Sequence, residues 1–293
     1  MKLRKHITFI LIILIFLISG LYSIGVMVKE HNTNLKAYET RIHECEMSGD
    51  NDSYCEEVLN SKKPTWNDSF TVLSEVLNRF NFITYIAPLL IIIISLNSFL
   101  YKLKNGTIKN YLTRIDYKDF ILKEWFSSLK FVFIIPLYVT FLFLIILLIT
   151  HNLDYSSANS DTFWFNFSFF NNIALWIFVF MINMIFQSIF WINLGFICSF
   201  NSKNIPLTYI TSFLTYLAIW AFFEIVIGQF VGVFLFNNSL IYEYVSLPTI
   251  WNYVGVDNLL VFTLIQFFLA FISFIVFLCI YKNKEKVLIN NET

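Results

Sequence analysis

Few residues in this sequence have the type and spacing that catalysis requires. No Gly-x-x-x-x-Gly-Lys-Ser/Thr loop is present, and none of the eight glycines precedes a lysine, so the chain lacks the backbone cradle that holds nucleotide phosphates. No Gly-x-Ser-x-Gly elbow or His-Glu-x-x-His pair occurs either. We therefore expect no catalytic residue and no cofactor. Any use of ATP would need the active site of another polypeptide.

The other residues that could do chemistry are polar groups inside long apolar runs. Glu224 is the only acidic residue well inside such a run, and an ionised carboxylate costs about 2.5–3.5 kcal/mol at the centre of a bilayer. It could face a translocation path or join two helices by a hydrogen bond. Asn183 and Gln187, one helical turn apart, allow the same two interpretations. With Gln229, these residues form the candidate lining of a path.

The four cysteines separate into two pairs. Cys45 and Cys55 fall in a polar segment that we place outside the cell, so they could form a disulfide or remain free thiols. Cys198 and Cys279 lie near the ends of apolar runs and are interpreted as packing residues. No cysteine and histidine spacing is typical of zinc, so we expect no metal.

The elements that must position these residues are membrane spans. Hydrophobic residues make up 57% of the chain and charged residues only 14%, with a mean hydropathy of +0.67, whereas soluble domains carry roughly 25% charge. Each apolar run meets the roughly 20 residues needed to cross a bilayer. The prediction is an all-α polytopic membrane protein, one transmembrane domain over residues 1–293, with six transmembrane helices at about 7–28, 82–101, 129–150, 173–200, 207–227 and 259–281. The first run is too long for a secretory signal, so we expect it to be retained.

The distribution of lysine and arginine predicts the orientation. Three precede the first run, seven lie in the central loop, one is Lys203 and three follow the last run, whereas the other six of the twenty lie in residues 29–81. Because these residues resist translocation, both termini are expected in the cytoplasm of a plasma-membrane protein. No nucleic-acid partner is expected.

Two segments depart from simple spans. Residues 29–81 continue the first helical pattern, turn near Ser48 and resume a helical pattern before the second span, which predicts a small external helical hairpin. The fifth run is longer than one crossing requires. Its Gly228 and Gly232 could pack closely against a neighbouring helix, or the span could break near Gly228 and continue as a re-entrant segment over 228–250.

The central loop, residues 101–130, is basic, and its segment 102–128 has internal structure. A short amphipathic segment begins at Gly106-Thr107, with Ile108, Tyr111 and Leu112 at helical spacing, and Asp116 is a candidate N-cap for the next helix. Such a helix at the membrane surface suits docking of a soluble partner. A solvated positive loop without a partner has the same charge pattern.

The run Gly106-Thr107-Ile108-Lys109-Asn110-Tyr111-Leu112-Thr113, followed by a polar turn and a rising apolar span, resembles the cytoplasmic loop of type-2 ATP-binding-cassette exporter permeases. The six-span layout extends this resemblance to nearly the whole chain.

The resemblance implies a coupling helix that contacts an ATP-binding-cassette ATPase subunit, and a second permease chain in a homodimer or heterodimer. The corresponding coupling residues here are Gly106, Thr107, Ile108, Lys109, Tyr111, Leu112, Arg114 and Asp116. The implied function is export of a peptide, an antibiotic or a lipid-like substrate by a subunit that is not itself an enzyme.

Other functions fit part of the pattern. A six-span immunity or scaffold protein could bind a peptide through residues 29–81 without ATP. An ion-coupled carrier would need several ionisable groups at mid-membrane, and Glu224 is a single one.

Overall fold

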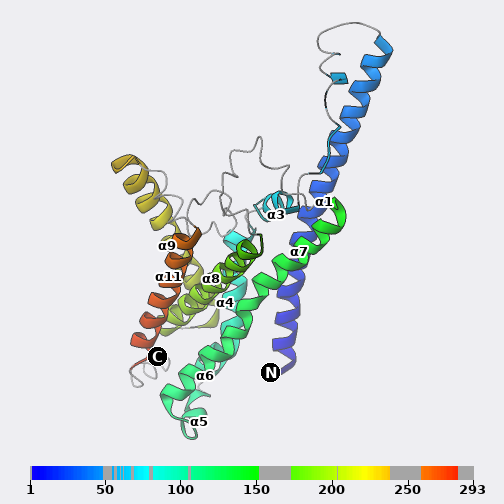
Figure 1. Ribbon diagram of the computed structural model, residues 1–293. Helices are drawn as coiled ribbons and strands as arrows, with labels where there is room; N and C mark the ends of the chain where they lie inside the picture. The colour runs from blue at the N-terminus through cyan, green and yellow to red at the C-terminus, as the bar shows by residue number, and fades with distance from the viewer. Residues whose placement is uncertain are drawn as a thin grey trace.

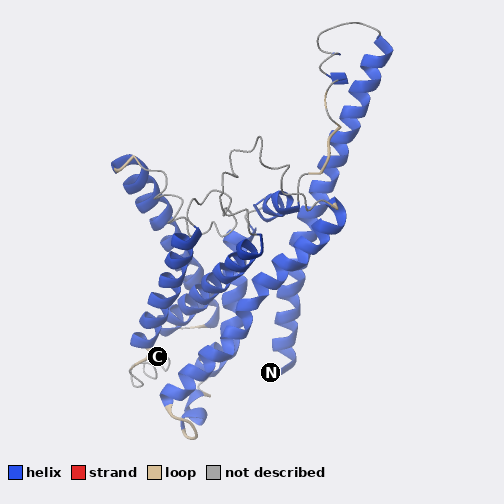
Figure 2. Ribbon diagram, in the orientation of Figure 1, coloured by secondary structure: helices blue, strands red, loops and turns tan. Residues whose placement is uncertain are grey.

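The computed structural model describes residues 2–48, 55, 58–59, 61, 63–66, 69–78, 82–104, 107–151, 173–202, 204–237 and 259–282. All regular secondary structure in these ranges is helical (Figures 1 and 2). Six helical stretches are long and apolar enough to cross a membrane, which confirms the predicted all-α, six-span architecture.

Four of the six spanning stretches are single helices and two are continuous runs of several helices. They are α1 (Lys2–Ser48), α4 (Phe82–Lys104), the continuous run of α6 (Tyr117–Leu129), η1 (Lys130–Phe133) and α7 (Ile134–Thr150), α8 (Ile173–Asn201), α9 (Ile205–Ala221) with the π-helix η4 (Phe222–Leu235), and α11 (Leu259–Ile280). Two shorter helices, α3 (Ser69–Asn78) and α5 (Ile108–Leu112), lie outside these stretches.

Helices α4 and α8 form the centre of the bundle. Helix α8 packs against α4, α6, η1, α7, α9 and α11. Gly195 permits the close approach of α8 to α4, because a Cβ there would lie 2.9 Å from both methyl groups of Leu96. Gly20 does the same where α1 meets α7, since its Cβ would lie 2.6 Å from Leu142. Small residues let helix backbones approach closely in this way.

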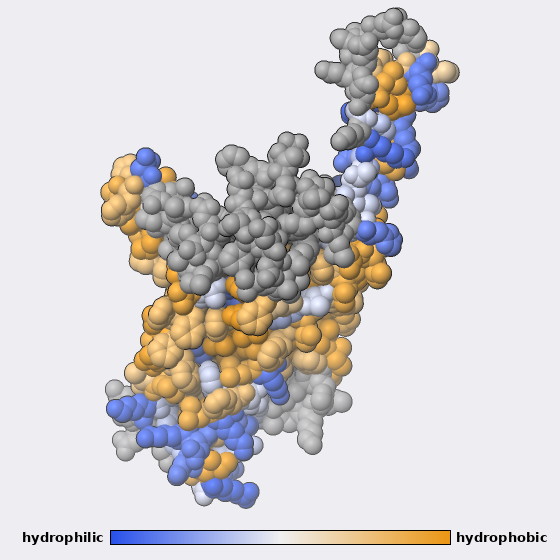
Figure 3. All heavy atoms as spheres, viewed as in Figure 1, coloured by the Kyte–Doolittle hydropathy of each residue, from blue (hydrophilic) through white to orange (hydrophobic). Residues whose placement is uncertain are grey.

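The two ends of the bundle differ in polarity. The N-terminus, α5 and the C-terminal end of α11 lie at one end, which we call the α5 end, and α3 lies toward the other (Figure 1). An apolar band separates the polar α5 end from the polar outer part of α1 (Figure 3). The band is the part of the surface suited to lipid.

Helix α1 extends far beyond the bundle as an arm. Its 47 residues span about 70 Å at 1.5 Å per residue, more than twice a bilayer core of about 30 Å. At the tip, Cys45 and Cys55 are joined by a disulfide with their Cα atoms 5.3 Å apart. Farther down, the Tyr38 hydroxyl donates to the Ser61 carbonyl oxygen at 3.0 Å, which holds the returning chain against α1.

The returning leg of this arm is not helical throughout. Residues 55, 58 and 59 are helical and residues 63–66 have no regular structure. The second helical pattern, predicted just before the second span, is present as α3. Helix α3 then packs back on the bundle, where the Ser69 and Thr150 hydroxyls lie 2.8 Å apart.

The fifth spanning stretch does not break near Gly228, which was one of the two interpretations of its length. The backbone changes from α to π geometry at Phe222 and stays helical to Leu235, past Gly228. Gly228 and Gly232 are buried, whereas most of the large side chains around them are exposed. The return of the re-entrant segment, residues 238–250, lies outside the described residues.

Candidate functional site

The α5 end contains the residues singled out as a coupling segment. Helix α5 follows the end of α4 and packs against α6. The Thr107 hydroxyl donates to the Lys102 carbonyl oxygen at 3.2 Å, and the Tyr111 ring lies 5.8 Å from that of Phe120 on α6. Gly106 and the side chain of Lys109 lie outside the described residues.

A buried ion pair joins the helices around α5. The Lys102 ammonium donates to Glu124 Oε1 of α6, and the two side chains are only 15% and 9% exposed. The same ammonium lies 4.9 Å from the centre of the Tyr111 ring and 5.9 Å from that of Phe120. Each contact stabilises the cation in a partly desolvated place. Lys102 therefore links α4, α5 and α6 through one group.

The inner side of α5 belongs to the protein's own core. Ile108 is buried and Leu112 is half-buried against the core, while Tyr111 is exposed. The expected amphipathic helix is present, but its apolar side faces α6 rather than a partner. The exposed surface of α5, of the turn after it and of the start of α6, which we call the α5 face, consists of Asn110, Tyr111, Thr113, Arg114, Asp116, Lys118 and Asp119.

Asp116 occupies the predicted N-cap position of α6 but does not cap it through its side chain. Its carbonyl oxygen accepts from the Phe120 amide at 2.9 Å, and the carboxylate is left exposed. The carboxylates of Asp116 and Asp119 and the cations of Arg114 and Lys118 give the α5 face mixed charge.

Lys104 fastens the end of α4 to the end of α8. Its ammonium donates to the Ser199 carbonyl oxygen at 3.1 Å and to the Ser202 carbonyl oxygen. A cation is favourable at a helix C-terminus, where carbonyl groups lack partners in the helix. The Ser199 hydroxyl lies 2.6 Å from the hydroxyl of Tyr281, just after α11. Burial raises the pKa of Tyr281, so this hydroxyl stays protonated and donates to the Phe196 carbonyl oxygen at 3.1 Å.

Asn193 is an important polar residue that the sequence reasoning missed. Its side-chain oxygen accepts from the Trp125 indole at 2.8 Å, and its amide nitrogen donates to the Ala270 carbonyl oxygen and the Ser273 hydroxyl at 3.1 and 2.9 Å. It thus joins α6, α8 and α11. Trp125 is correspondingly buried. The signal was available, since Asn193 interrupts an apolar run as Asn183 does.

The four residues predicted to line a path fall in two settings. Asn183 and Gln187 are buried in α8, and the Asn183 amide donates to the Thr263 hydroxyl of α11 at 2.9 Å. This hydrogen bond joins α8 to α11, in agreement with the helix-joining interpretation of Asn183. Glu224 is half-buried and Gln229 exposed on the π-helix η4. None of the four lines either of the two cavities described below.

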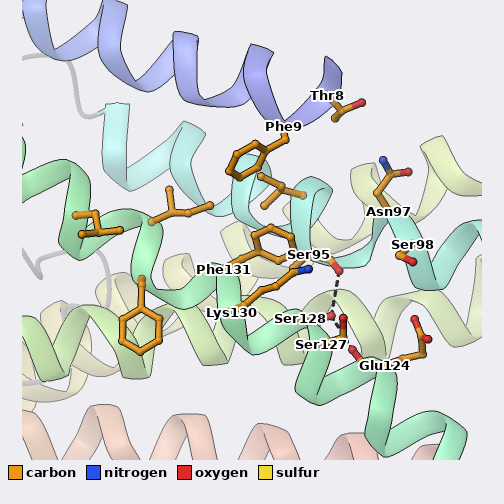
Figure 4. Close-up of a pocket in the computed structure, with 14 residues that line it drawn as sticks. Thr8, Phe9, Ser95, Asn97, Ser98, Glu124, Ser127, Ser128, Lys130 and Phe131 are labelled. Carbon is orange, nitrogen blue, oxygen red and sulfur yellow. Dashed lines mark hydrogen bonds between the residues drawn. The ribbon is translucent and has the colours of Figure 1, made fainter. Parts of the chain in front are cut away.

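The larger cavity, of about 670 Å³, opens between α1, α4 and the α6–α7 run (Figure 4). Its polar lining comes from all three: Thr8, Ser95, Asn97, Ser98, Glu124, Ser127, Ser128 and Lys130. Phe9, Ile94, Phe131, Phe133, Ile134 and Leu137 complete it. No sequence pattern indicated this cavity, because its walls come from residues far apart in the chain.

A smaller cavity of about 240 Å³ lies between α1 and the returning leg of the arm. The His31 and Trp66 rings stack beside it with centres 3.7 Å apart. Among the described residues, no group of three or more histidine, cysteine or acidic side chains could hold a metal ion.

Comparison with protein-family models, with curated proteins and with solved structures finds no match to this chain. The fold and the site together define a multi-pass helical membrane protein with a structured loop at its α5 end.

Proposed function

We propose that this chain is the permease subunit of an ATP-driven exporter of the type-2 ATP-binding-cassette kind, with both termini in the cytoplasm. The observation that carries the proposal is the construction of the α5 end. A five-residue helix has its inner side fixed to α4 and α6, and the exposed turn that follows it and the start of α6 carry charges of both signs. The positive-inside rule and the resemblance of the 106–113 segment support the same placement.

In this proposal the chain forms the translocation path and transmits movement from the α5 face to the spans. A separate ATPase subunit supplies the energy. Movement of the α5 face would be transmitted to α4 and α6 through the ion pair of Lys102 with Glu124. It continues to α8 through Lys104 and to α11 through Tyr281. Because these contacts are one ion pair and several hydrogen bonds that are partly or fully buried, the ends of four spans would move together.

The exposed apolar surfaces of α1, α9–η4 and α11 would face lipid or a second permease chain. Glu224 and Gln229 on η4, with the buried Asn183 and Gln187, remain the candidate path residues. A peptide, an antibiotic or a lipid-like molecule is the proposed class of substrate.

The test reverses charge on the α5 face alone. The pair Arg114→Glu and Lys118→Glu alters two exposed cations and touches no core contact. We expect affinity purification of the tagged full chain from its native host to recover an ATP-binding-cassette ATPase, and the double variant to recover at least about tenfold less, since charge reversal at a contact costs several kcal/mol.

The matched control reverses two exposed lysines on the arm, Lys29→Glu and Lys36→Glu. It should leave ATPase recovery unchanged. Equal recovery with all three forms of the chain would remove the support for docking at the α5 face.

A second candidate is an ATP-independent immunity or scaffold protein that binds a peptide through the arm. The arm itself favours it, because a disulfide closes the tip and Met47 and Leu59 expose apolar side chains there, 77% and 49% accessible. Met47→Asp with Leu59→Asp should abolish peptide binding under this candidate and leave export unchanged under the first.

A further inference from the structure

The 670 Å³ cavity has a polarity gradient that repeats on each of its walls. On α4, Ser98, Asn97 and Ser95 give way to Ile94 with distance from the α5 end. On the α6–α7 run, Ser127, Ser128 and Lys130 give way to Phe133 and Leu137 in the same direction.

Helix α1 repeats the order with Thr8 followed by Phe9. Three helices that are independent in sequence therefore place hydroxyl, amide and ammonium groups toward the α5 end and apolar groups toward the middle of the bundle (Figure 4).

The polar half of the cavity carries one net positive charge. Glu124 is neutralised by Lys102, which leaves the Lys130 ammonium as the remaining charge of the lining. In the described part of the chain, that ammonium contacts the Phe131 ring at 4.9 Å and pairs with no carboxylate. The side chains of Asn97 and Ser127 likewise make no hydrogen bond to the described residues. A cation and two hydrogen-bonding groups are thus available to a ligand.

The apolar half of the cavity is open to the lipid side. Phe133 and Leu137 are 53% and 68% exposed; Phe133 ends η1 and Leu137 lies in the first turn of the strongly apolar helix α7. A small hydrophilic anion would leave this half unused. An amphiphile with an anionic head and hydrocarbon chains would fill both.

We propose that this cavity binds an anionic phospholipid of the leaflet at the α5 end. The phosphate group pairs with Lys130 and accepts from Asn97 and Ser127, and the acyl chains run along Phe133 and Leu137. The proposal does not depend on the chain being a permease. It assigns this face of α1, α4 and α6–α7 to a specific lipid rather than to a protein partner.

The experiment measures lipid binding to the purified full chain in detergent by native mass spectrometry, with phosphatidylglycerol and phosphatidylcholine as probes. One lysine near an anionic lipid head contributes about a fivefold change in affinity. We therefore expect phosphatidylglycerol to bind about fivefold tighter than phosphatidylcholine, Lys130→Gln to abolish this preference, and Lys130→Arg to keep it.

Lys123→Gln is the matched control, because Lys123 is an exposed lysine on α6 that does not line the cavity. It should bind both lipids as the parent chain does. The proposal would be overturned if Lys130→Gln and Lys123→Gln lost the preference for phosphatidylglycerol equally. It would also be overturned if the parent chain bound phosphatidylglycerol and phosphatidylcholine equally. Full competition by soluble glycerol phosphate would overturn it too, since the site would then take a free anion and not a lipid.

Discussion

Single charged residues hold the α5 end together. Lys102 and Glu124 are 22 positions apart in the chain, yet their contact is nearly closed to solvent. Removal of one partner leaves a charge without its counterion in a desolvated place, which costs far more than the loss of an exposed ion pair. The site's geometry therefore depends on this pair more than on any residue of α5 itself.

At this scale we predict that Lys102→Met lowers the free energy of unfolding by about 3 kcal/mol, because Glu124 is left without its counterion. The measurement is thermal or denaturant unfolding of the full chain in detergent. Lys63→Met is the control: its ion pair with Glu39 has side chains 60% and 54% exposed, so the loss should stay below about 1 kcal/mol.

Replacement of both partners by Lys102→Met and Glu124→Met should recover much of the lost stability, since no unpaired charge remains. A double variant that loses the sum of the two single losses would show that the two residues act independently.

At the scale of the elements, the packing of α4 on α8 sets the positions of the other spans. Gly195→Leu should lower the free energy of unfolding by about 2–3 kcal/mol, because the new side chain must displace Leu96 in a closely packed contact. Gly25→Leu is the matched control, since nothing lies within 4 Å of its Cβ position.

Gly25→Leu should be neutral or stabilise the chain by up to about 1 kcal/mol, as glycine is a poor helix former. The same unfolding assay compares both variants. Equal effects at the two positions would argue against close contact of α4 with α8 at Gly195.

We predict that the stability of the arm is separable from that of the bundle. Reduction of the Cys45–Cys55 disulfide should raise hydrogen exchange in residues 36–48, because closure of a short loop contributes about 2–3 kcal/mol to the tip. Exchange in α4 and α8 should stay unchanged. Faster exchange throughout the spans would mean that arm and bundle unfold together.

Features that depend on neighbouring residues in the chain were predicted from the sequence, whereas contacts between residues far apart in the chain were not. Apolar runs predicted all six spanning stretches, since membrane insertion depends on local hydropathy. The contact of Lys102 with Glu124, the hydrogen-bond partners of Asn193 and the larger cavity depend on residues brought together by packing, so spacing along the chain did not indicate them. Ile108, one of the predicted coupling residues, is buried in the core of the chain. An apolar side of a helix predicts burial but not the surface against which it is buried.

For the whole molecule, binding of an ATPase at the α5 face requires that the α5 end lie in the cytoplasm. The N-terminus, α5 and the end of α11 share one end of the bundle, and the arm extends from the other (Figure 1). We predict that Lys118→Cys is labelled by an impermeant maleimide only after the cells are opened, whereas Lys36→Cys is labelled in intact cells. The reverse labelling pattern would place the α5 face outside, where no ATPase could reach it.

Our proposal that an ATPase subunit binds the α5 face can be tested by crosslinking in living cells. A photoreactive amino acid at Arg114, which is exposed on that face, would be activated in the native host and its products identified by mass spectrometry. We expect a crosslink from Arg114 to an ATP-binding-cassette ATPase, and no such crosslink from the same group placed at Lys36 on the arm. Crosslinks from Arg114 to lipid alone, with no ATPase recovered, would contradict the proposal.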